Sequence, residues 1–380
     1  MRVKRLGVLF SALIPAVLLL SGPSGALGNT PYTLQQFMTI NGAPAPTNLS
    51  TDILWYDRDT NEVYVADRRP TNGIDVFSAE NDYYLGTFDM GNMAGTHSDR
   101  NLNGPNGVLT DDQHRIWAGD GVGSVHNPTQ SEVVVGTLNG SVTAIPTGGN
   151  HRTDEMGFDP LDHIVLAAND AESPGFDFLS FISSNSLKVV KKLLLDGTSG
   201  TPLAVGAEQP VWDRQTRMFY MTLDVATSGE IDTIDPKTMS ITHRLTLTTL
   251  DAGCTSVNGL ALDPDTQTLA VGCPDAGLIV RVRDWSLLAS IPQAAPSDEE
   301  WFNPGNDTFL FGLVGGTPQG VAIVDANTNT LLQVLTLTPN PSSARCCNVT
   351  ADQRSNKIFQ PLSGYGIAVE FPSGAPDLDR

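Results

Sequence analysis

Short apolar segments that end in an Asp or Asn turn repeat along the chain, and each is followed by a second β-rich segment. Residues 52–57 before 63–67 and residues 106–111 before 116–120 are clear examples. The turn residues that align the repeats are spaced by 40 to 54 positions: Asp57, Asp111, Asp159, Asp213, Asp263, Asn303 and Asp352. Helical periodicity is absent after the N-terminal segment. Four short strands in each such period are typical of a β-propeller. The pattern therefore predicts an all-β, seven-bladed β-propeller in one domain, residues 29–380.

The first and last segments of the repeated region predict how the ring closes. The seventh unit stops after about three strands, and residues 34–40 stand before the first repeat without a blade of their own. We expect this N-terminal segment to supply the missing outer strand of blade seven, because an open sheet edge would invite aggregation.

The first 28 residues have the layout of a secretory signal peptide. Arg2, Lys4 and Arg5 precede an apolar run over residues 8–20, and a small-x-small cleavage site ends at Gly28. The apolar run is too short for a transmembrane helix. We therefore expect a secreted, extracellular protein, or a periplasmic one in a Gram-negative host.

The charge balance restricts the partners of the protein. It has 42 Asp and Glu against 22 Lys and Arg, for a net charge of −20. Such an acidic surface argues against nucleic acid and anionic membranes as partners, and it attracts cations. We expect a monomer that binds a small molecule or a saccharide.

Four cysteines in an exported chain favour disulfide pairing. Cys254 and Cys273 flank one strand pair, so we predict a bridge between them. Cys346 and Cys347 are adjacent, and the sequence leaves open a vicinal disulfide, free thiols or other partners.

A column of polar residues lies five positions before the turn residues. Six of its seven members carry a side-chain oxygen, and Cys347 is the seventh: Asp52, Asn106, Asp154, Glu208, Asn258 and Asp298. The innermost strands of a propeller run along its channel, so these six residues would form a ring at one mouth. Facing carboxylates repel, and a hard cation would relieve the repulsion. We predict a divalent cation here, Ca²⁺ first, with Mg²⁺ or Mn²⁺ as alternatives. A water-filled polar mouth without metal is the other interpretation.

Three histidines fall in connections that emerge at the same mouth: His97, His126 and His151. Five arginines lie in loops at that end: Arg68, Arg69, Arg100, Arg152 and Arg345. The basic sector suggests an anionic substrate such as a carboxylate, and histidine can act as acid or base near neutral pH. Alternatively, these residues belong to long polar loops without a role. For His114, His163 and His243 we expect only structural or solvated roles.

The repeats resemble those of secreted YVTN-type and gluconolactonase-like propellers over essentially the whole of residues 29–380. Residues 104–108, 208–213 and 257–261 carry the resemblance. In the gluconolactonase group a channel cation is held at the starts of inner strands, which implies Asn106, Asp154, Glu208 and Asn258 as ligands. That group has six blades, so the substrate does not carry over. The seven-bladed streptogramin lyases and polysaccharide lyases look similar in using a histidine base beside a metal.

Three functions follow from these features. The first is a metal-assisted, lactonase-like hydrolase for a small carboxylated or lactone-like substrate, in which the cation polarises a carbonyl and His151 acts as base. His97 or His126 would be the acid or the orienting group. The second is a β-eliminating lyase for a uronate-containing saccharide or cyclic ester, with Arg152 neutralising the carboxylate. The third is a non-catalytic extracellular binding scaffold.

Overall fold

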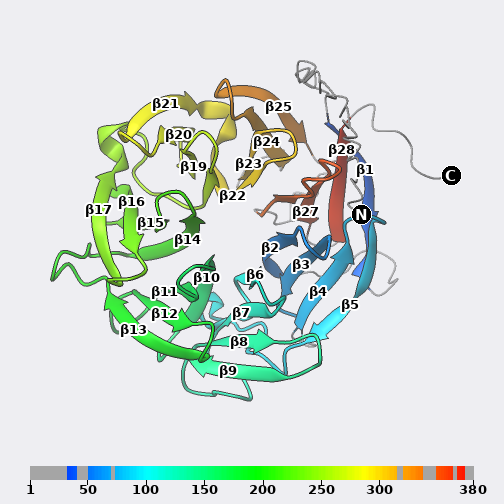
Figure 1. The fold of residues 1–380 in the computed structure, drawn as a ribbon, viewed down its shortest axis with the longest axis vertical. Helices are drawn as coiled ribbons and strands as arrows, with labels where there is room; N and C mark the ends of the chain where they lie inside the picture. The colour runs from blue at the N-terminus through cyan, green and yellow to red at the C-terminus, as the bar shows by residue number, and fades with distance from the viewer. Residues whose placement is uncertain are drawn as a thin grey trace, which may run out of the picture.

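In the computed structural model, seven four-stranded antiparallel sheets are arranged in a ring, whose centre we call the channel (Figure 1). The structure describes residues 32–40, 50–69, 73–314, 320–336, 348–362 and 366–372. The predicted seven-bladed, all-β propeller is confirmed. The expected signal peptide, Arg345, Cys346 and Cys347 lie outside the described residues. In the part of the chain that the structure describes, no helix is long and apolar enough to cross a membrane.

Each of the first six blades consists of four consecutive strands, ordered from the channel outward. Blades one to three contain β2 (Thr51–Asp57), β3 (Glu62–Asp67), β4 (Gly73–Ser78), β5 (Tyr83–Asp89), β6 (Val108–Thr110), β7 (Ile116–Asp120), β8 (Glu132–Gly136), β9 (Val142–Pro146), β10 (Arg152–Asp159), β11 (Ile164–Asp170), β12 (Phe178–Ser183) and β13 (Lys188–Leu194). Blades four to six contain β14 (Gly206–Asp213), β15 (Met218–Val225), β16 (Ser228–Asp235), β17 (Ser240–Thr246), β18 (Leu260–Asp263), β19 (Thr268–Gly272), β20 (Gly277–Arg281), β21 (Ser286–Ile291), β22 (Ser297–Asn303), β23 (Thr308–Leu313), β24 (Gly320–Asp325) and β25 (Thr330–Thr336). Short 3₁₀ turns η2 (Arg100–Leu102), η3 (Leu247–Thr249) and η4 (Pro292–Ala294) lie in connections between blades.

The closing strand comes from the N-terminal part of the chain, as predicted. Blade seven is formed by β26 (Thr350–Ala351), β27 (Ile358–Leu362), β28 (Gly366–Pro372) and, on its outside, β1 (Tyr32–Met38). β1 runs antiparallel to β28, and the two ends of the ring lie side by side in Figure 1. The observed strand begins two residues before the predicted segment, and Ile40 follows it as a buried residue.

The seven turn residues that align the repeats share one structural task. The side chain of each accepts a hydrogen bond from the backbone N–H two residues later, at 2.7 to 3.0 Å, in the turn that joins the first two strands of its blade. Asp and Asn favour this local turn because their short side chains reach that N–H. The repeat is therefore visible in the sequence because every blade needs the same turn.

The hydrophobic core is divided among the interfaces between blades. Seven clusters of buried apolar side chains occur in the described residues, and each joins two neighbouring blades. One of them joins Met38 and Ile40 of the N-terminal segment to Leu54 of blade one and Phe359 of blade seven. A blade alone would leave its faces exposed, so the blades stabilise one another around the ring.

The predicted disulfide is confirmed. Cys254, in the connection after η3, is bonded to Cys273, which directly follows β19, with 5.0 Å between their Cα atoms. Both side chains are buried in the cluster between blades four and five. The bridge therefore links the connection that enters blade five to the second strand of that blade.

Candidate functional site

The polar ring predicted at the channel mouth coincides with a repeated irregularity of the inner strands. The pairing register of β2, β10, β14 and β22 with the next strand shifts at the same place in each, around the ring residue and the residue after it. Such β-bulges re-aim side chains and are common beside functional sites. In each strand the register shift spans two residues, namely Asp52–Ile53, Asp154–Glu155, Glu208–Gln209 and Asp298–Glu299. Asn106 and Asn258 stand just before β6 and β18.

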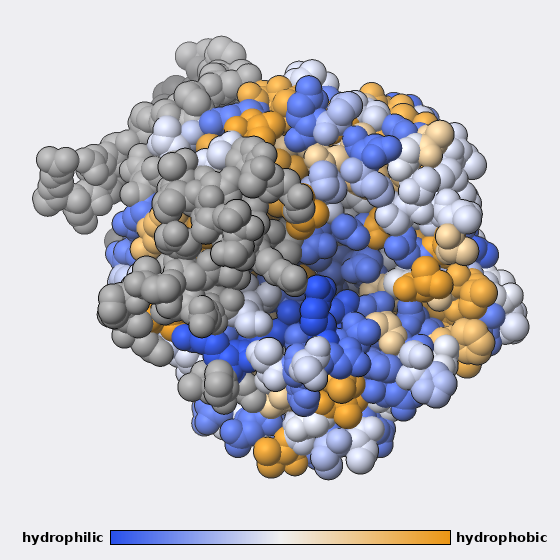
Figure 2. All heavy atoms as spheres, turned by 180° about the vertical axis from the view of Figure 1, so that it is seen from behind, coloured by the Kyte–Doolittle hydropathy of each residue, from blue (hydrophilic) through white to orange (hydrophobic). Residues whose placement is uncertain are grey.

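The acidic members of this ring lie close enough to influence one another. The negative charges of Asp52 and Asp170 help to raise the pKa of Asp154, and those of Asp154 and Glu155 help to raise that of Glu208. Burial is the largest cause of both shifts, and it brings the pKa of Asp154 to about 7. Figure 2 shows one face of the ring, with hydrophilic residues gathered in its hollowed centre.

Two arginines, Arg68 and Arg152, are bonded to members of the polar ring. The guanidinium of Arg68 donates hydrogen bonds to the Asp52 carboxylate and, at 2.6 Å, to Oδ1 of Asn106. Its neighbour Arg69 is held within blade one by Asp67 and Asp75. Two of the five arginines predicted to receive an anionic substrate, Arg68 and Arg69, are thus paired with carboxylates of the protein itself.

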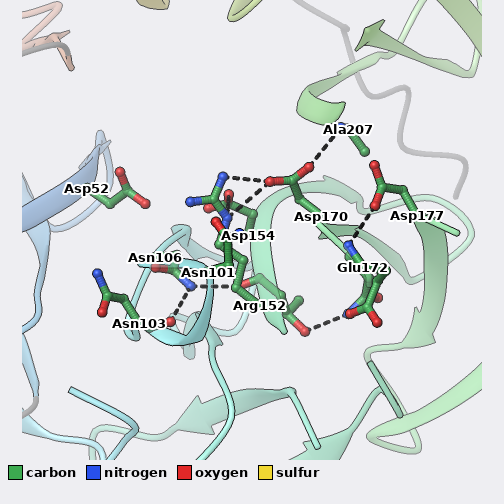
Figure 3. Close-up of polar contacts among 12 residues, drawn as sticks. Asp52, Asn101, Asn103, Asn106, Arg152, Asp154, Asp170, Glu172, Asp177 and Ala207 are labelled. Carbon is green, nitrogen blue, oxygen red and sulfur yellow. Dashed lines mark hydrogen bonds and ion pairs between the residues drawn. The ribbon is translucent and has the colours of Figure 1, made fainter. Parts of the chain in front are cut away.

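Arg152 is paired in the same way on blade three (Figure 3). Its Nε lies 2.7 Å from Oδ2 of Asp154, and its Nη2 lies 2.6 Å from Oδ2 of Asp170. Burial opposes the positive charge of Arg152, but the charges of Asp154 and Asp170 outweigh it and raise the pKa of the guanidinium. Arg152 therefore stays protonated and holds the two carboxylates in place.

The amide members of the ring connect neighbouring blades. Nδ2 of Asn106 donates to the Thr153 carbonyl at 3.1 Å, and Nδ2 of Asn258 donates to the Ser297 carbonyl at 2.8 Å. Glu208 differs from both, because among the described residues its carboxylate has no hydrogen bond or ion pair, and it is only partly buried. Glu208 is therefore the ring carboxylate most open to a ligand.

A second pair of carboxyl groups lies one residue further along the inner strands. Glu155 of blade three and Glu299 of blade six contact each other through a side-chain hydrogen bond, although their blades stand on opposite sides of the channel. They are 5% and 7% exposed, and Oε2 of each has no partner. Burial raises the pKa of both well above the usual range, and the charge and hydrogen bond of Glu155 raise that of Glu299 further. The two carboxyl groups therefore retain a proton between them.

The glycines beside this pair allow the bulges to approach the neighbouring blade. A Cβ atom at Gly107 would clash with the backbone of Asp154 and Glu155, and one at Gly259 would clash with that of Asp298 and Glu299. A side chain at either position would therefore displace a bulge that carries the carboxylates.

The three candidate histidines lie in loops of the mouth but do not meet. His97 Nε2 is 3.0 Å from the Ala94 carbonyl, His126 Nδ1 is 3.5 Å from a Glu132 oxygen, and His151 Nδ1 accepts a hydrogen bond from Ser173 N–H at 3.2 Å. Among the described residues, no hydrogen bond or ion pair links these imidazoles to the six ring residues. The structure places each histidine as a local loop contact.

A different group of possible metal ligands lies at the other end of the inner strands. Side-chain atoms of Asp57, Asp59 and His114 lie within 4.8 Å of one another, in the inner turns of blades one and two. His114 has a φ of 56° and stands at the turn position that Gln267 occupies in blade five and Asn356 in blade seven. The side chains of Gln267 and Asn356 form hydrogen bonds with the preceding blade. Nδ1 of His114 has no hydrogen-bond partner in the described structure, so the structural or solvated role expected for His114 stays a prediction.

Glu155 was not among the predicted site residues, and Glu299 was interpreted as a flank of Asp298 rather than as a ligand, because only one residue of each inner strand was assigned to the ring. The signal was nonetheless present. The column shifted by one position contains Glu155, Gln209, Glu299 and Asn348, which are polar where a regularly alternating strand would turn a side chain away from the channel. Reading two successive polar residues as a bulge would have found the pair.

Comparison with known proteins supports the fold of this chain but does not assign the chain to a family. No protein family and no curated protein matches this sequence. Among solved structures, the WD40 domain of Pan2 from Neurospora crassa is similar, with a TM-score of 0.63 and 11% sequence identity. The similarity covers 92% of this chain and 97% of that domain. At this identity the likeness supports a seven-bladed propeller and says nothing of catalysis.

Proposed function

We propose that this protein is an extracellular binding propeller that holds a divalent cation, Ca²⁺ first, in its acidic channel. The contact between Glu155 and Glu299 is the observation that carries the proposal, because two buried carboxyl groups share a proton that a cation would replace. Each also has an unpartnered oxygen. Ca²⁺ takes six to eight oxygen ligands in irregular geometry, which suits a channel lined by carboxylates and amides.

The predicted ring would complete the cation site. Asp154 and Asp298 directly precede the pair on β10 and β22, and Glu208 of β14 and Asn258 before β18 belong to the two blades between them. Asp52 and Asn106 are bonded to Arg68, and Oδ2 of Asp154 is paired with Arg152. The gluconolactonase-like resemblance points to the same mouth. Oxygen-only ligands favour Ca²⁺, Mg²⁺ or Mn²⁺ over Zn²⁺.

Calcium is expected to stabilise the folded protein at pH 8. At one hundred times its dissociation constant, a cation that binds only the folded state adds about 2.7 kcal/mol, and a chelator should remove the effect. The double variant Glu155→Gln/Glu299→Gln should lose the calcium-dependent rise in melting temperature, and Asp154→Asn or Glu208→Gln should reduce it. Glu370→Gln, which changes a buried carboxyl group of blade seven, serves as the control and should keep it. No bound metal in elemental analysis, together with an unchanged melt, would overturn the proposal.

Binding is preferred to catalysis because the groups needed for either predicted reaction have partners within the protein. Arg152 is paired with Asp154 and Asp170, and Nδ1 of His151 accepts a backbone hydrogen bond. A free base beside the cation is what both reactions require. The hydrolase and the lyase remain predictions.

Reaction products separate the three functions. With lactones and with uronate-containing polysaccharides as substrates, we expect neither release of acid nor an unsaturated product that absorbs in the near ultraviolet. Acid release that disappears in His151→Ala would favour the hydrolase, and ultraviolet absorption that disappears in the same variant would favour the lyase.

Export from the cell is part of the proposal. The signal-like N-terminal segment suggests it, and the Cys254–Cys273 bridge fits an oxidising compartment, where disulfides form and persist. Extracellular fluids also contain the calcium that the channel would bind.

A further inference from the structure

Hydrophobic side chains lie exposed on the rim above blades three and four. Phe176, between β11 and β12, is 49% exposed, and Leu203 and Val205, between β13 and β14, are 51% and 66% exposed. We call these three residues the rim patch. Apolar side chains gathered on a soluble protein in this way mark interaction sites. Both connections emerge at the end of the blades that carries the ring, and β14 reaches Glu208 three residues after Val205.

The two connections that carry the rim patch are fastened to each other. Leu195 donates its N–H to the Asp177 carbonyl at 2.9 Å and accepts from the Ala204 N–H at 3.1 Å. Val205 N–H donates to the Asp224 carbonyl at 2.8 Å. The patch is therefore formed before any ligand arrives, which reduces the ordering that binding would require.

Two carboxyl groups without a cationic partner in the described residues accompany the rim patch. Asp177 follows Phe176, is 4% exposed, and has one oxygen, Oδ2, without a partner. Burial raises its pKa to about 7. On the channel side, the Glu208 carboxylate has no hydrogen bond or ion pair among the described residues. Arg152, on the inner strand of blade three, is already paired with Asp154 and Asp170. A ligand that brings its own cation would stabilise the ionised form of a carboxyl group here.

We infer that the rim patch and Glu208 form a docking site for a segment of another protein in which Lys or Arg stands next to hydrophobic residues. The cationic group would bond to the Glu208 carboxylate at the channel mouth in place of the divalent cation, and the hydrophobic neighbours would pack on Phe176, Leu203 and Val205. A second copy of this chain is a poor occupant, because a net charge of −20 opposes its approach to an acidic mouth. The part of this inference that concerns Glu208 at the channel mouth rests on the proposed binding function.

A random dodecapeptide library displayed on phage, selected on the full chain in chelator, tests the inference. We expect the enriched peptides to combine Lys or Arg with adjacent hydrophobic residues. Synthetic copies should bind the double variant Leu203→Ser/Val205→Ser at least roughly tenfold more weakly, and Glu208→Gln should weaken binding and its salt dependence. Leu138→Ser is the matched control, because Leu138 is a 68% exposed leucine in the turn between β8 and β9. All variants change partly exposed residues, so their melting temperatures should match the parent.

Several outcomes would overturn the inference. Enriched peptides without basic residues would contradict it, and so would equal loss of binding in Leu138→Ser or no enrichment at all. A concentration-dependent dimer that the double variant converts to monomer would assign the patch to a second copy instead. Calcium binding without peptide binding would leave the proposed function in place and reject only this docking site.

Discussion

Raising the pH from 5 to 8.5 is expected to lower the melting temperature of this protein by about 10 °C or more, measured in chelator. The cause is the number of buried carboxyl groups whose pKa burial raises. Those of Asp67, Asp154 and Asp177 rise to about 7, and those of Asp120, Asp232 and Glu370 rise to about 8. In the unfolded chain the same groups titrate near pH 4.

The direction follows from the protons that each state binds. Between about pH 4 and pH 7 to 8 the folded protein keeps protons that the unfolded chain has released, so the free energy of unfolding falls as the pH rises. The stabilisation is fully present below the unfolded pKa and is lost by the folded pKa. Each group contributes about 1.4 kcal/mol per pH unit, so two groups acting from pH 5 to 7 remove about 5 kcal/mol.

Isosteric amides provide the sharpest check of this pH dependence. Asp232 and Glu370 are fully buried, and their carboxyl oxygens have no side-chain hydrogen-bond partner in the described structure; the nearest cation to Asp232 is Arg244, with 4.0 Å between Nε and Oδ1. Asp232→Asn and Glu370→Gln should therefore flatten the fall in melting temperature and raise stability at pH 8. Asp284→Asn is the control, because Asp284 is exposed and its hydrogen bond with Arg281 lowers its pKa, so it titrates below this window. A melting temperature that stays level or rises from pH 5 to 8.5 would contradict the prediction.

The fold was predictable because each blade repeats the same short-range requirement. Every inner hairpin needs an Asx turn, so residues such as Asp57 and Asn303 recur at a spacing that the eye can align. The closing strand was predictable for a related reason. The last repeat lacked one strand, and residues 34–40 at the start of the repeated region had no blade of their own. The bridge between Cys254 and Cys273 followed from their positions around a single strand pair.

The channel site was predictable only in part. The ring positions could be aligned from the turn residues, but the partners of the ring could not, because Arg68 reaches from the end of β3 to residues of two blades. The contact between Glu155 and Glu299 joins blades that are 144 positions apart in the sequence, and it depends on bulges in both inner strands. Alternation of polar and apolar residues does not reveal such bulges, so long-range pairing in the channel required the structure.

Removing residues 32–40 is expected to have the largest effect of all, namely loss of the folded, soluble protein. The deletion takes away the outer strand of blade seven and exposes the edge of β28. It also removes Met38 and Ile40 from the cluster between blades seven and one. Each such side chain contributes about 1.5–3 kcal/mol when fully buried, against a total stability of about 5–15 kcal/mol.

The segment also fastens blade seven to blade six. Tyr32 N–H donates to Gln333 Oε1 at 2.7 Å, Gln333 Nε2 donates back to the Tyr32 carbonyl at 3.0 Å, and Asn306 Nδ2 donates to the Tyr32 hydroxyl at 2.6 Å. Deletion therefore removes contacts to both neighbours of blade seven at once. We expect the deleted protein to aggregate or to be cut rapidly by protease, whereas removal of residues 1–28 alone should leave the melting temperature unchanged.

Moving the strand distinguishes a missing blade edge from general damage. Because Tyr32 pairs with Pro372 in the antiparallel β1–β28 pair, a copy of residues 32–40 joined behind Pro372 by a two-residue turn would form a hairpin in the same register. This fusion, made in the deleted protein, should restore solubility and cooperative melting. The same fusion with Met38→Asp and Ile40→Asp should not, because both side chains are buried at the interface with blade one. If the deleted protein melted within about 2 °C of the parent, a shift worth roughly 1 kcal/mol or less, β1 would not be what closes the ring.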